Sequence, residues 1–200
     1  MSYKKYTKQT WKGSVLTSPV PPTLVTSSYN GIINVFTVAW TGIMCTKPPV
    51  TYISVRPERY SYELIDKSGE FVINLASKEL VKAVDICGVK SGKNTNKFEL
   101  TGLTTSSGSK VKAPVIEQAP LSLECKVRDK IELGTHVVFV ADIVAVDVAQ
   151  ELIDKDGRLE LEKADLIAYS HGEYFELGKR LGSFGYSVRK KKSNKRGSKK

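Results

Sequence analysis

The sequence predicts a mainly β fold, a β-barrel with a few short helices. Three observations indicate it. Segments rich in β-branched and aromatic residues recur along the chain, two long ones are separated only by a Gly-Thr pair, and helix-like stretches are few and short. Many strands in a chain of 200 residues close most simply into a barrel, because closure removes the exposed edges of the sheet.

Three strands are predicted behind a polar arm that runs to about Ser18. Residues 20–28 (VPPTLVTSS) begin near two prolines, which fix the backbone in an extended geometry. Residues 33–42 (INVFTVAWTG) and 49–55 (PVTYISV) are rich in β-branched and aromatic side chains, as strands are.

Two short helices frame the next predicted strand, residues 70–76 (EFVINLA). Residues 62–69 (YELIDKSG) are typical of a helix that ends at a glycine. Residues 77–88 (SKELVKAVDICG) indicate a helix with the serine as its N-cap and the last glycine just beyond its end. The polar residues 89–102 predict a loop.

The second half of the chain is predicted to be almost entirely strand. Residues 119–134 and 135–150 are two long strands around the Gly-Thr turn, and residues 165–178 carry a final short strand or two. Residues 135–150 are nearly continuously apolar, as expected of a strand buried on both faces of a barrel wall or at a subunit interface.

The net charge of +10 is concentrated at the C-terminus. The last twelve residues, RKKKSNKRGSKK, hold eight Lys or Arg and no acid, so we expect a disordered basic tail at 189–200 behind a single domain at 1–188. No RNA-binding signature accompanies the tail, so we do not expect it to be a nucleic-acid site. No apolar run is long enough to span a membrane and the start does not resemble a signal peptide, so we expect a cytoplasmic protein without a membrane segment.

Metal and disulfide chemistry is not predicted. The cysteines Cys45, Cys87 and Cys125 are far apart, odd in number and form no CxxC pair. His136 and His171 are too few and too separated for a metal motif. Neither GxSxG nor GxGxxG occurs, so any redox chemistry would need a bound cofactor held in another way.

An anion site is suggested where a strand runs into a helix, in SVRPERYSYEL. Arg56 and Arg59 stand beside Ser61, close to the expected helix start. A helix start offers free backbone N–H groups and a partial positive charge, and arginine offers a planar fork of donors suited to phosphate. The alternative is a serine-capped helix with surface arginines, and the local sequence favours neither.

Two further polar stretches could belong to a binding site. SGKNTNKF (residues 91–98) combines a glycine with two lysines, although a lysine-bearing turn is usually just solvated. NVFTVAW places Asn34 and Thr37 among apolar residues, and on a strand Asn34 faces the same way as Trp40 and opposite to Thr37. Such groups either bond local backbone or meet the polar edge of a planar ligand.

The order of the segments is more specific than any one of them. It runs VPPTLVTS, NVFTVAWTG, KPPVTYISVRPERYSYELIDKSGEFVINLAS, DICGVKSGKNTNKF, APLSLECKV, GTHVVFVADIVAV and HGEYFELGKRLGSFGYSVRKK. Together these segments resemble the flavin reductase-like family of FMN-binding split barrels, particularly its flavoredoxin-type branch, over residues 19–189. The resemblance implies a Greek-key split barrel and a homodimer, with FMN rather than FAD bound near the dimer interface.

The resemblance also implies which residues hold the flavin. Around the phosphate it implies Arg59, Ser61 and Tyr62. Closing over the phosphate and ribityl chain it implies Ser91, Gly92, Lys93 and Lys97. Around the isoalloxazine ring it implies Asn34, Thr37, Trp40, Thr41 and the backbone at Ser54 and Val55, with Asn74 supporting the pocket.

His136 is the catalytic residue that the resemblance implies, because the family's histidine lies near the flavin and the nicotinamide. The chain departs from the family at two places. Its turn reads Gly134-Thr135-His136 instead of Gly-Asp-His, and SGKNTNKF replaces SGRDxDKF. Lys93 keeps the charge of the family's arginine but not its forked geometry.

Three functions compete. The first is an NAD(P)H-dependent flavin reductase. The second is an electron carrier of the same fold, reduced by a protein partner, and nicotinamide oxidation would separate the two. The third is a binding module based on the basic tail, for which deleting residues 189–200 would abolish the main activity. It ranks last, because the tail is separate from the motifs that carry the resemblance.

Overall fold

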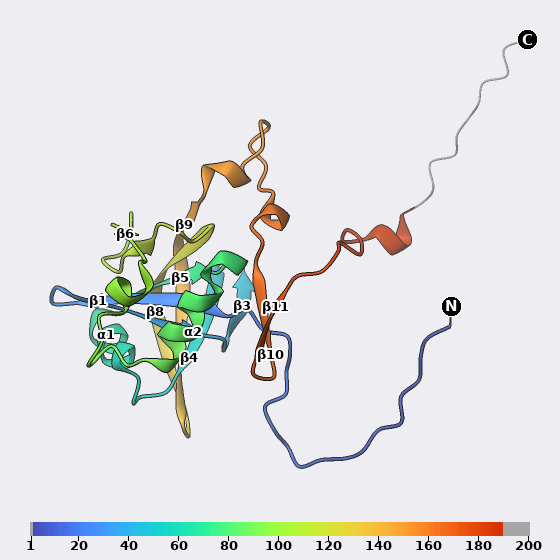
Figure 1. Cartoon of the computed structure of the whole chain (residues 1–200), viewed down its shortest axis with the longest axis horizontal. Coiled ribbons are helices and arrows are strands. Elements are labelled where there is room, and N and C mark those ends of the chain that lie inside the picture. The colour runs from blue at the N-terminus through green and yellow to red at the C-terminus, as the bar shows by residue number, and fades with distance from the viewer. Residues whose placement is uncertain (1, 190–200) are drawn as a thin grey trace, which may run out of the picture.

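The computed structural model describes residues 2–189, so that most of the predicted basic tail lies outside the described residues. Its main sheet has seven antiparallel strands in the order β2-β1-β5-β8-β9-β4-β3 (Figure 1). These are β1 (Thr23–Tyr29), β2 (Ile32–Val38), β3 (Thr41–Thr46), β4 (Pro49–Val55), β5 (Glu70–Leu75), β8 (Leu121–Leu133) and β9 (His136–Val148).

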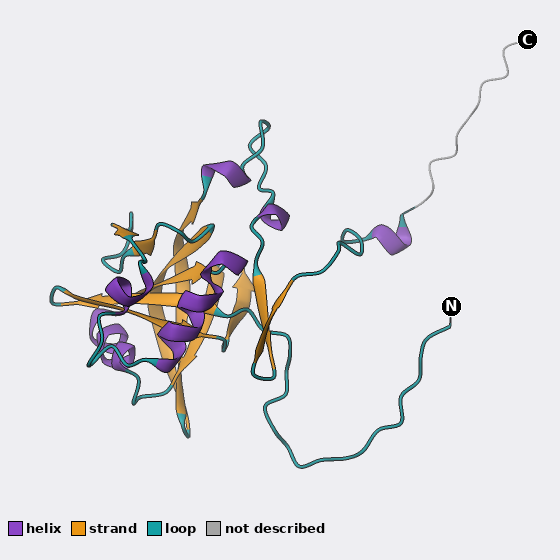
Figure 2. Cartoon of the chain, viewed as in Figure 1, coloured by secondary structure: helices purple, strands orange, loops and turns teal. Residues whose placement is uncertain are grey.

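The remaining elements are short (Figure 2). Two small antiparallel pairs are formed by β6 (Thr105–Ser106) with β7 (Val115–Ile116) and by β10 (Ile167–Ser170) with β11 (Glu173–Glu176). The helices are α1 (Tyr60–Ser68), α2 (Val81–Val89) and α3 (Lys97–Thr101), with single 3-10 turns at η1 (Lys78–Leu80), η2 (Gln150–Leu152), η3 (Leu161–Lys163) and η4 (Tyr186–Val188).

The sheet curls because its two end strands are neighbours in the chain. Strand β2 ends at Val38 and β3 begins at Thr41, although they lie at opposite ends of the strand order. Consecutive Cα atoms are about 3.8 Å apart, so a two-residue link holds these ends close together. The backbone N–H of Ser54 donates to the Trp40 carbonyl over 2.9 Å, which ties the link to β4. The result is a barrel split between β2 and β3, and the single strand predicted at 33–42 is in fact two.

Alternating side chains of the strands fill two cores. One face of β1 and β2, with Val25 and Phe36, points into the barrel and packs with Phe139. The other face, with Leu24 and Val35, packs with α2 and its neighbourhood. The barrel is thus lined on the inside and covered by helix on the outside, and α2 is held against β2.

Helix α2 corrects the predicted helix at 77–88. Ser77 precedes the 3-10 turn η1 and makes no side-chain capping bond. Gly88 lies inside α2, which ends at Val89. A Cβ on Gly88 would meet the Thr37 Cβ at 3.4 Å, an ordinary van der Waals contact, so Gly88 faces β2 from within the helix and does not mark its end.

Helices α1 and α3 also differ from the prediction. Helix α1 begins at Tyr60 with Arg59 at the N-cap position, two residues earlier than expected, and Gly69 ends it with φ of 68°. Helix α3 lies inside the predicted loop at 89–102. Its five residues are bounded by Asn96, whose side chain accepts from the Glu99 N–H, and by Gly102 with φ of 71°.

The long hairpin β8–β9 turns at Gly134 and Thr135, as predicted. The half of β9 next to the turn is mostly buried, but Val144 and Val146 near its end are 36% and 51% exposed. Within residues 2–189, no helix is long and apolar enough to cross a membrane.

Candidate functional site

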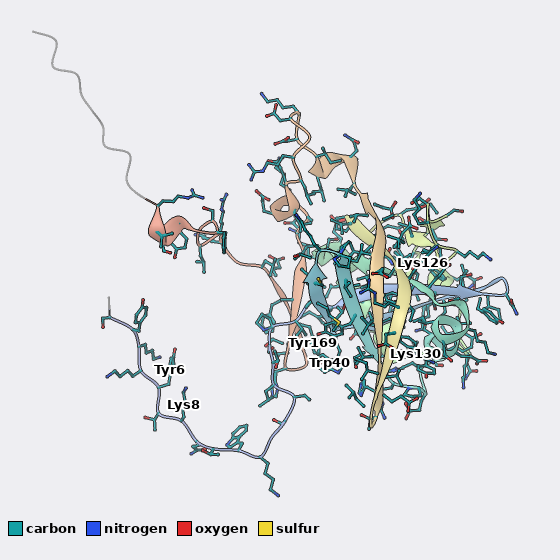
Figure 3. All side chains as sticks on the ribbon, turned by 180° about the vertical axis from the view of Figure 1, so that it is seen from behind. Tyr6, Lys8, Trp40, Lys126, Lys130 and Tyr169 are labelled. Atoms are coloured by element: carbon teal, nitrogen blue, oxygen red, sulfur yellow. The ribbon has the colours of Figure 1, made fainter. Side chains whose placement is uncertain are left out.

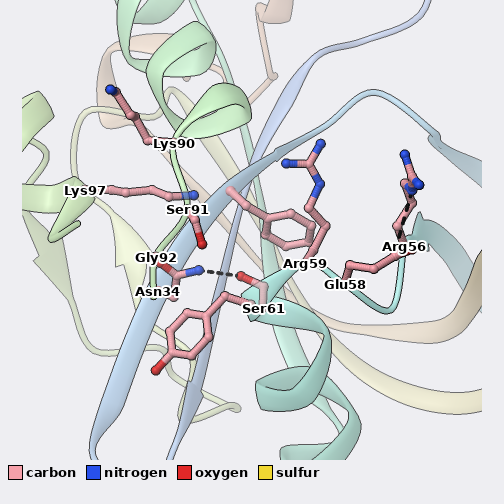
Figure 4. Close-up of a pocket in the computed structure, with 11 residues that line it drawn as sticks. Asn34, Arg56, Glu58, Arg59, Ser61, Lys90, Ser91, Gly92 and Lys97 are labelled. Carbon is pink, nitrogen blue, oxygen red and sulfur yellow. Dashed lines mark hydrogen bonds and ion pairs between the residues drawn. The ribbon is translucent and has the colours of Figure 1, made fainter. Parts of the chain in front are cut away.

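A cavity of about 300 Å³ lies where α1 begins, beside β2 and the loop after α2 (Figure 4). We call it the cationic cavity. It is lined by Asn34, Phe36, Arg56, Glu58, Arg59, Tyr60, Ser61, Lys90, Ser91, Gly92 and Lys97. Four of these side chains are basic and one is acidic, and the acid, Glu58, lies 3.6 Å from the Arg56 Nε. The lining therefore suits an anion.

The start of α1 forms one wall of the cationic cavity. Ser61, 1% exposed, lies in the first turn, where helix N–H groups lack partners within the helix. The Asn34 Nδ2 donates to the Ser61 Oγ over 2.8 Å (Figure 4), which joins β2 to α1. Arg59 donates from Nη1 to the Gly88 carbonyl over 3.2 Å, which joins α1 to α2. Three elements thus hold these donors in place.

Lys97 brings a buried ammonium to the same cavity. It is only 3% exposed, and its Nζ donates to the Val35 carbonyl over 2.8 Å and to the Cys87 carbonyl over 2.9 Å. An ammonium has three donors, so one remains for a ligand. Burial lowers the pKa of Lys97 to about 8, with the charge of Arg59 acting in the same direction and Cys87 opposing it.

Gly92 is the residue that lets the loop approach this wall. A Cβ at this position would lie 2.3 Å from the Asn34 Oδ1 and 2.8 Å from the Tyr60 Cδ1. No other residue type fits without moving Asn34 or Tyr60. The backbone of the loop therefore lies directly against the side chains that line the cationic cavity.

A second cavity, of about 240 Å³, adjoins the first and shares Phe36, Arg56 and Arg59 with it. We call it the aromatic cavity. It is lined by Pro22, Phe36, Thr37, Val38, Ala39, Trp40, Ser54, Val55, Arg56, Arg59, Gly88, His136, Tyr169 and Tyr174. Tyr169 and Tyr174 come from β10 and β11, with ring centroids 5.5 Å apart.

Two polar side chains of the aromatic cavity, Thr37 and His136, have a neighbour within hydrogen-bonding distance. The Thr37 hydroxyl donates to the Val84 carbonyl of α2 and is therefore already engaged. The Thr135 Oγ1 lies 2.9 Å from the His136 Nδ1. The tautomer of the imidazole decides which of these two atoms donates. A cavity with aromatic walls and convergent polar groups is typical of a site for a planar organic ligand.

The two cavities bring together most of the residues that the sequence singled out, from segments far apart in the chain. The cationic cavity holds Asn34, Arg59, Ser61, Ser91, Gly92 and Lys97. The aromatic cavity holds Thr37, Trp40, Ser54, Val55, Arg59 and His136. Lys93 lines a further cavity that adjoins the cationic one through Asn34, Tyr60, Gly92 and Lys97.

Thr41, Tyr62 and Asn74 lie elsewhere. The Thr41 hydroxyl donates to the Tyr52 carbonyl over 2.6 Å, and the Tyr62 ring packs on Phe139 with centroids 5.4 Å apart. Asn74, fully buried, donates to the Leu24 carbonyl over 2.9 Å and accepts from the Ile116 N–H and the Ser122 hydroxyl. All three brace the barrel, and their expected part in ligand binding remains a prediction.

Asn34 and Trp40 were expected to face the same way as residues of one strand, but Trp40 lies beyond the end of β2. Asn34 lines the cationic cavity, whereas Trp40 lines the aromatic cavity together with Thr37. The strict alternation of a strand stops at Val38, where β2 ends, so the residues of the following link turn independently.

Several lining residues were not predicted. Arg56 stood out in the sequence beside Arg59 but had no assigned role, although it lines both cavities. Lys90 carried only the signal of a lysine after a helix. Tyr169 and Tyr174 lie about 130 residues from Trp40 along the chain and no local pattern links them. Within residues 2–189, no group of three or more His, Cys, Asp or Glu side chains could hold a metal ion.

Comparison with solved structures identifies the fold. Flavoredoxin of Desulfovibrio vulgaris (Miyazaki F) superposes with a TM-score of 0.84 at 30% identity, covering 92% of this chain and 100% of that one. Flavoredoxin from Methanosarcina acetivorans gives 0.83 at 26% identity, covering 92% and 100%. A split-barrel protein from Shewanella frigidimarina gives 0.77 at 24% identity, covering 86% of this chain and 88% of that chain, which shows the shared fold.

Sequence comparison identifies the family. An uncharacterised protein of Archaeoglobus fulgidus is 33% identical over 142 residues, covering 71% of this chain and 79% of that protein. The reductase component of a 4-nitrophenol 4-monooxygenase/4-nitrocatechol 2-monooxygenase from Rhodococcus opacus is 24% identical, covering 61% of this chain and 62% of that protein. The model of the flavin reductase-like domain matches residues 15–178. The chain therefore belongs to the flavin reductase-like family and has the split-barrel fold of the flavoredoxins.

Proposed function

We propose that this protein binds FMN and acts as a flavin reductase, transferring hydride from NADH or NADPH to the flavin. The observation that carries the proposal is the pair of adjoining cavities. The cationic cavity lies at the start of α1, and the aromatic cavity is lined by aromatic rings. Phe36, Arg56 and Arg59 line both. FMN has the matching division into a phosphate and a planar ring system. Membership of the family supports the same ligand.

The residues of the cationic cavity fit a phosphate. Arg59 and Ser61 would hold it together with the N–H groups that open α1, and Lys97, which lines the same cavity, would supply its third ammonium donor. Because the backbone at Gly92 lies close to Asn34 and Tyr60, the loop at 91–93 would lie over the ligand.

The residues of the aromatic cavity fit the isoalloxazine ring. When bound, the flavin would supply the two-electron acceptor that the side chains lack. Trp40 and the backbone at Ser54 and Val55 would position the ring, and positioning is most of what a hydride transfer requires. His136 would stand beside the ring, where a ring N–H would stabilise negative charge that develops on the ligand.

An electron carrier reduced by a protein partner is the second candidate. The likeness to two flavoredoxins favours it, because their superpositions cover 92% of this chain. The cavities serve both functions equally, since both need a bound flavin. What separates them is the source of the electrons.

The test begins with the visible absorption spectrum of the purified protein and chromatography of the cofactor released by heat. Flavin absorbance with FMN released supports the ligand. Oxidation of NADH or NADPH with added flavin then supports the reductase, and bound flavin without such turnover supports the carrier. A protein that is colourless and fails to take up FMN contradicts both.

We also propose that the chain forms a homodimer. Ile43 and Met44 on the end strand β3 are 80% and 52% exposed. Exposed apolar side chains on an end strand are a surface that a second chain would cover. The family resemblance supports a dimer of this kind.

A further inference from the structure

The chain leaves the barrel after β11. Residues 179–189, which we call the terminal segment, run away from the barrel when the molecule is seen from either side (Figures 1 and 3). Within the described residues, the hydrogen bonds of the terminal segment stay inside it. The Tyr186 N–H donates to the Ser183 carbonyl over 2.9 Å, and the Val188 N–H donates to the Gly185 carbonyl over 3.3 Å. The proposed flavin site uses no residue of this segment.

The terminal segment exposes large apolar side chains. Leu181 and Val188 are 94% and 83% exposed, and the Phe184 side chain is completely exposed. Burying one such side chain contributes about 1.5–3 kcal/mol relative to leaving it in water. A segment that carries three of them is therefore stabilised by any surface that covers them.

The net charge of the protein lies in the terminal segment and the residues that follow it. Residues 179–200 hold ten Lys or Arg and no acid, whereas the rest of the chain holds 21 Lys or Arg and 21 Asp or Glu. Negative charge is concentrated just before the segment, because residues 150–178 hold eight acids and three Lys or Arg. These two stretches therefore attract each other.

A cavity of about 490 Å³, which we call the acidic cavity, lies between η3 and the end of β11. Its lining combines three leucines with three carboxylates: Leu161, Leu166, Leu177, Glu162, Asp165 and Glu176. Lys78 and Arg180 are its cations, and the Lys78 Nζ lies 3.0 Å from an Asp165 carboxylate oxygen. Among residues 2–189, Glu162 and Glu176 have no ion-pair partner. Such a lining suits a peptide that carries both apolar and basic side chains, as the terminal segment does.

The terminal segment begins beside the acidic cavity, because Gly178 and Arg180 are part of the lining, and then runs away from it (Figure 1). The extended chain from Gly178 to Phe184 reaches about 20 Å, which is enough to meet a second molecule. In a twofold dimer, a segment that leaves one copy beside this cavity can enter the same cavity of the other copy, and the second segment makes the equivalent contact. Two identical segments then cover two identical cavities.

We propose that two copies of the chain exchange their terminal segments, so that each segment lies in the acidic cavity of the other copy. This rests on the homodimer proposed above and names the segment that joins its two chains. Leu181 and Phe184 pack on the leucines of the acidic cavity. The basic side chains of the segment pair with Glu162 and Glu176.

A chemical cross-link tests which copy supplies the segment. The Cys45→Ser background removes the exposed thiol and leaves two buried ones. In that background, Glu162→Cys places a thiol in the acidic cavity and Ser187→Cys places one in the terminal segment. A flexible bismaleimide should join them into a product of twice the chain mass on a denaturing gel. In the control, Glu151→Cys replaces Glu162→Cys; position 151 is exposed on η2 outside the cavity lining, so little of this product should form.

The affinity between the two chains tests the packing of the segment separately. Phe184→Asp should raise the Kd of the dimer at least about tenfold, because it removes an apolar side chain and brings a carboxylate to an acidic cavity. Sedimentation at several protein concentrations measures this Kd. Ser187→Asp makes the same change of charge without removing an apolar side chain, so it should weaken the dimer less. Equal effects of the two variants would overturn the packing of Phe184 in the cavity.

The outcomes of the cross-link separate this inference from the homodimer on which it rests. A product of single-chain mass in which the two cysteine peptides are joined means that the segment folds back onto its own copy. If both thiols react with the reagent but are not joined, the segment does not lie in the acidic cavity. Either result overturns the exchange, while a double mass in solution keeps the homodimer. A wild-type protein of single-chain mass overturns both.

Discussion

At the scale of single residues, Lys97 sets a pH limit on the proposed phosphate site. Its pKa is lowered to about 8 by burial, and only the protonated form pairs with an anion. FMN affinity should therefore fall as the pH rises above about 8, by up to about tenfold per unit, while the phosphate stays a dianion, its second pKa being about 6. Titration of FMN fluorescence against protein at several pH values measures this.

Two variants make the Lys97 prediction specific. Lys97→Met should bind FMN more weakly near neutral pH and lose the break near pH 8. Lys90→Met, which removes another ammonium of the cationic cavity, should keep that break. An unchanged break in Lys97→Met would assign the titration to another group.

Folding stability should change with pH in the opposite sense at Lys97. Its folded pKa of about 8 lies below the ordinary 10.5, so the unfolded chain binds more protons between these values and the apoprotein gains stability as the pH rises through that window. Cys87 opposes this, because burial raises its pKa from 9.0 to about 11. Urea unfolding of wild type and Lys97→Met across this range isolates the lysine: the stability of the variant relative to wild type should fall with pH.

Gly92 gives a residue-scale prediction that needs no titration. Gly92→Ala places a Cβ 2.3 Å from the Asn34 Oδ1, so the loop or Asn34 must shift and the phosphate donors lose their alignment. We expect FMN to bind about tenfold more weakly. Gly178→Ala is the matched control, because nothing lies within 4 Å of its Cβ. Equal affinities in the two variants would show that the close approach at Gly92 does not matter for binding.

At the scale of elements, Glu124 of β8 holds a loop that carries no regular structure. This fully buried carboxylate accepts from the N–H groups of Ser109, Lys110 and Val111 and from the Ser109 hydroxyl, over 2.6 to 2.9 Å. Burial raises its pKa, but these donors together lower it further, so the net direction is downward. Its stabilisation is present above the ordinary pKa and is lost as the pH falls through the lowered value.

Glu124→Gln should lower the free energy of unfolding by about 3 kcal/mol, because the amide turns an NH₂ group toward N–H donors that then lack an acceptor. Urea unfolding at neutral pH measures it. Glu151→Gln, at an exposed position, should change the free energy little. A Glu124→Gln loss no larger than that of the control would mean that the loop satisfies its donors in another way.

The elements themselves were predictable where a segment is long and its pattern regular. Residues 49–55 are strand β4 as predicted, and the β8–β9 hairpin was visible from its turn and its length. The failures were short-range. Trp40 lies in the link between β2 and β3, where no glycine or proline marks the end of a strand. Helix α3 is signalled in the sequence only by Asn96 and Gly102 at its ends. Gly88 was expected just beyond the helix end, but α2 continues through it to Val89.

At the scale of the whole molecule, the candidate site is predictable only in part, because it is assembled by topology. Local chemistry singled out Arg59, Ser61 and the loop at 91–98, and their common cavity follows from the packing of α2 on β2. Tyr169 arrives from the far end of the chain through its bridge to Val20. Nothing in the neighbouring sequence of either residue encodes that pairing, so no local pattern could have shown that Tyr169 lines the aromatic cavity with Trp40.

The split in the barrel also bears on the oligomeric state of the protein, which can be measured. Strand β3 is an end strand of the sheet, and it exposes 80% of Ile43 beside a bulge in its pairing with β4. Bulges discourage further strand pairing, so we expect side-chain packing rather than sheet extension to cover this face.

Light scattering of the protein as it elutes from a size-exclusion column should give a mass of about twice the chain mass of 22.1 kDa. Ile43→Lys should shift the mass toward that of one chain, because an ammonium would have to be buried in the contact between the two chains. Leu159→Lys replaces a leucine that is 40% exposed in the loop after η2 and should keep the wild-type mass. A wild-type protein of single-chain mass would contradict the homodimer. An Ile43→Lys variant that retains the double mass would place the interface away from β3.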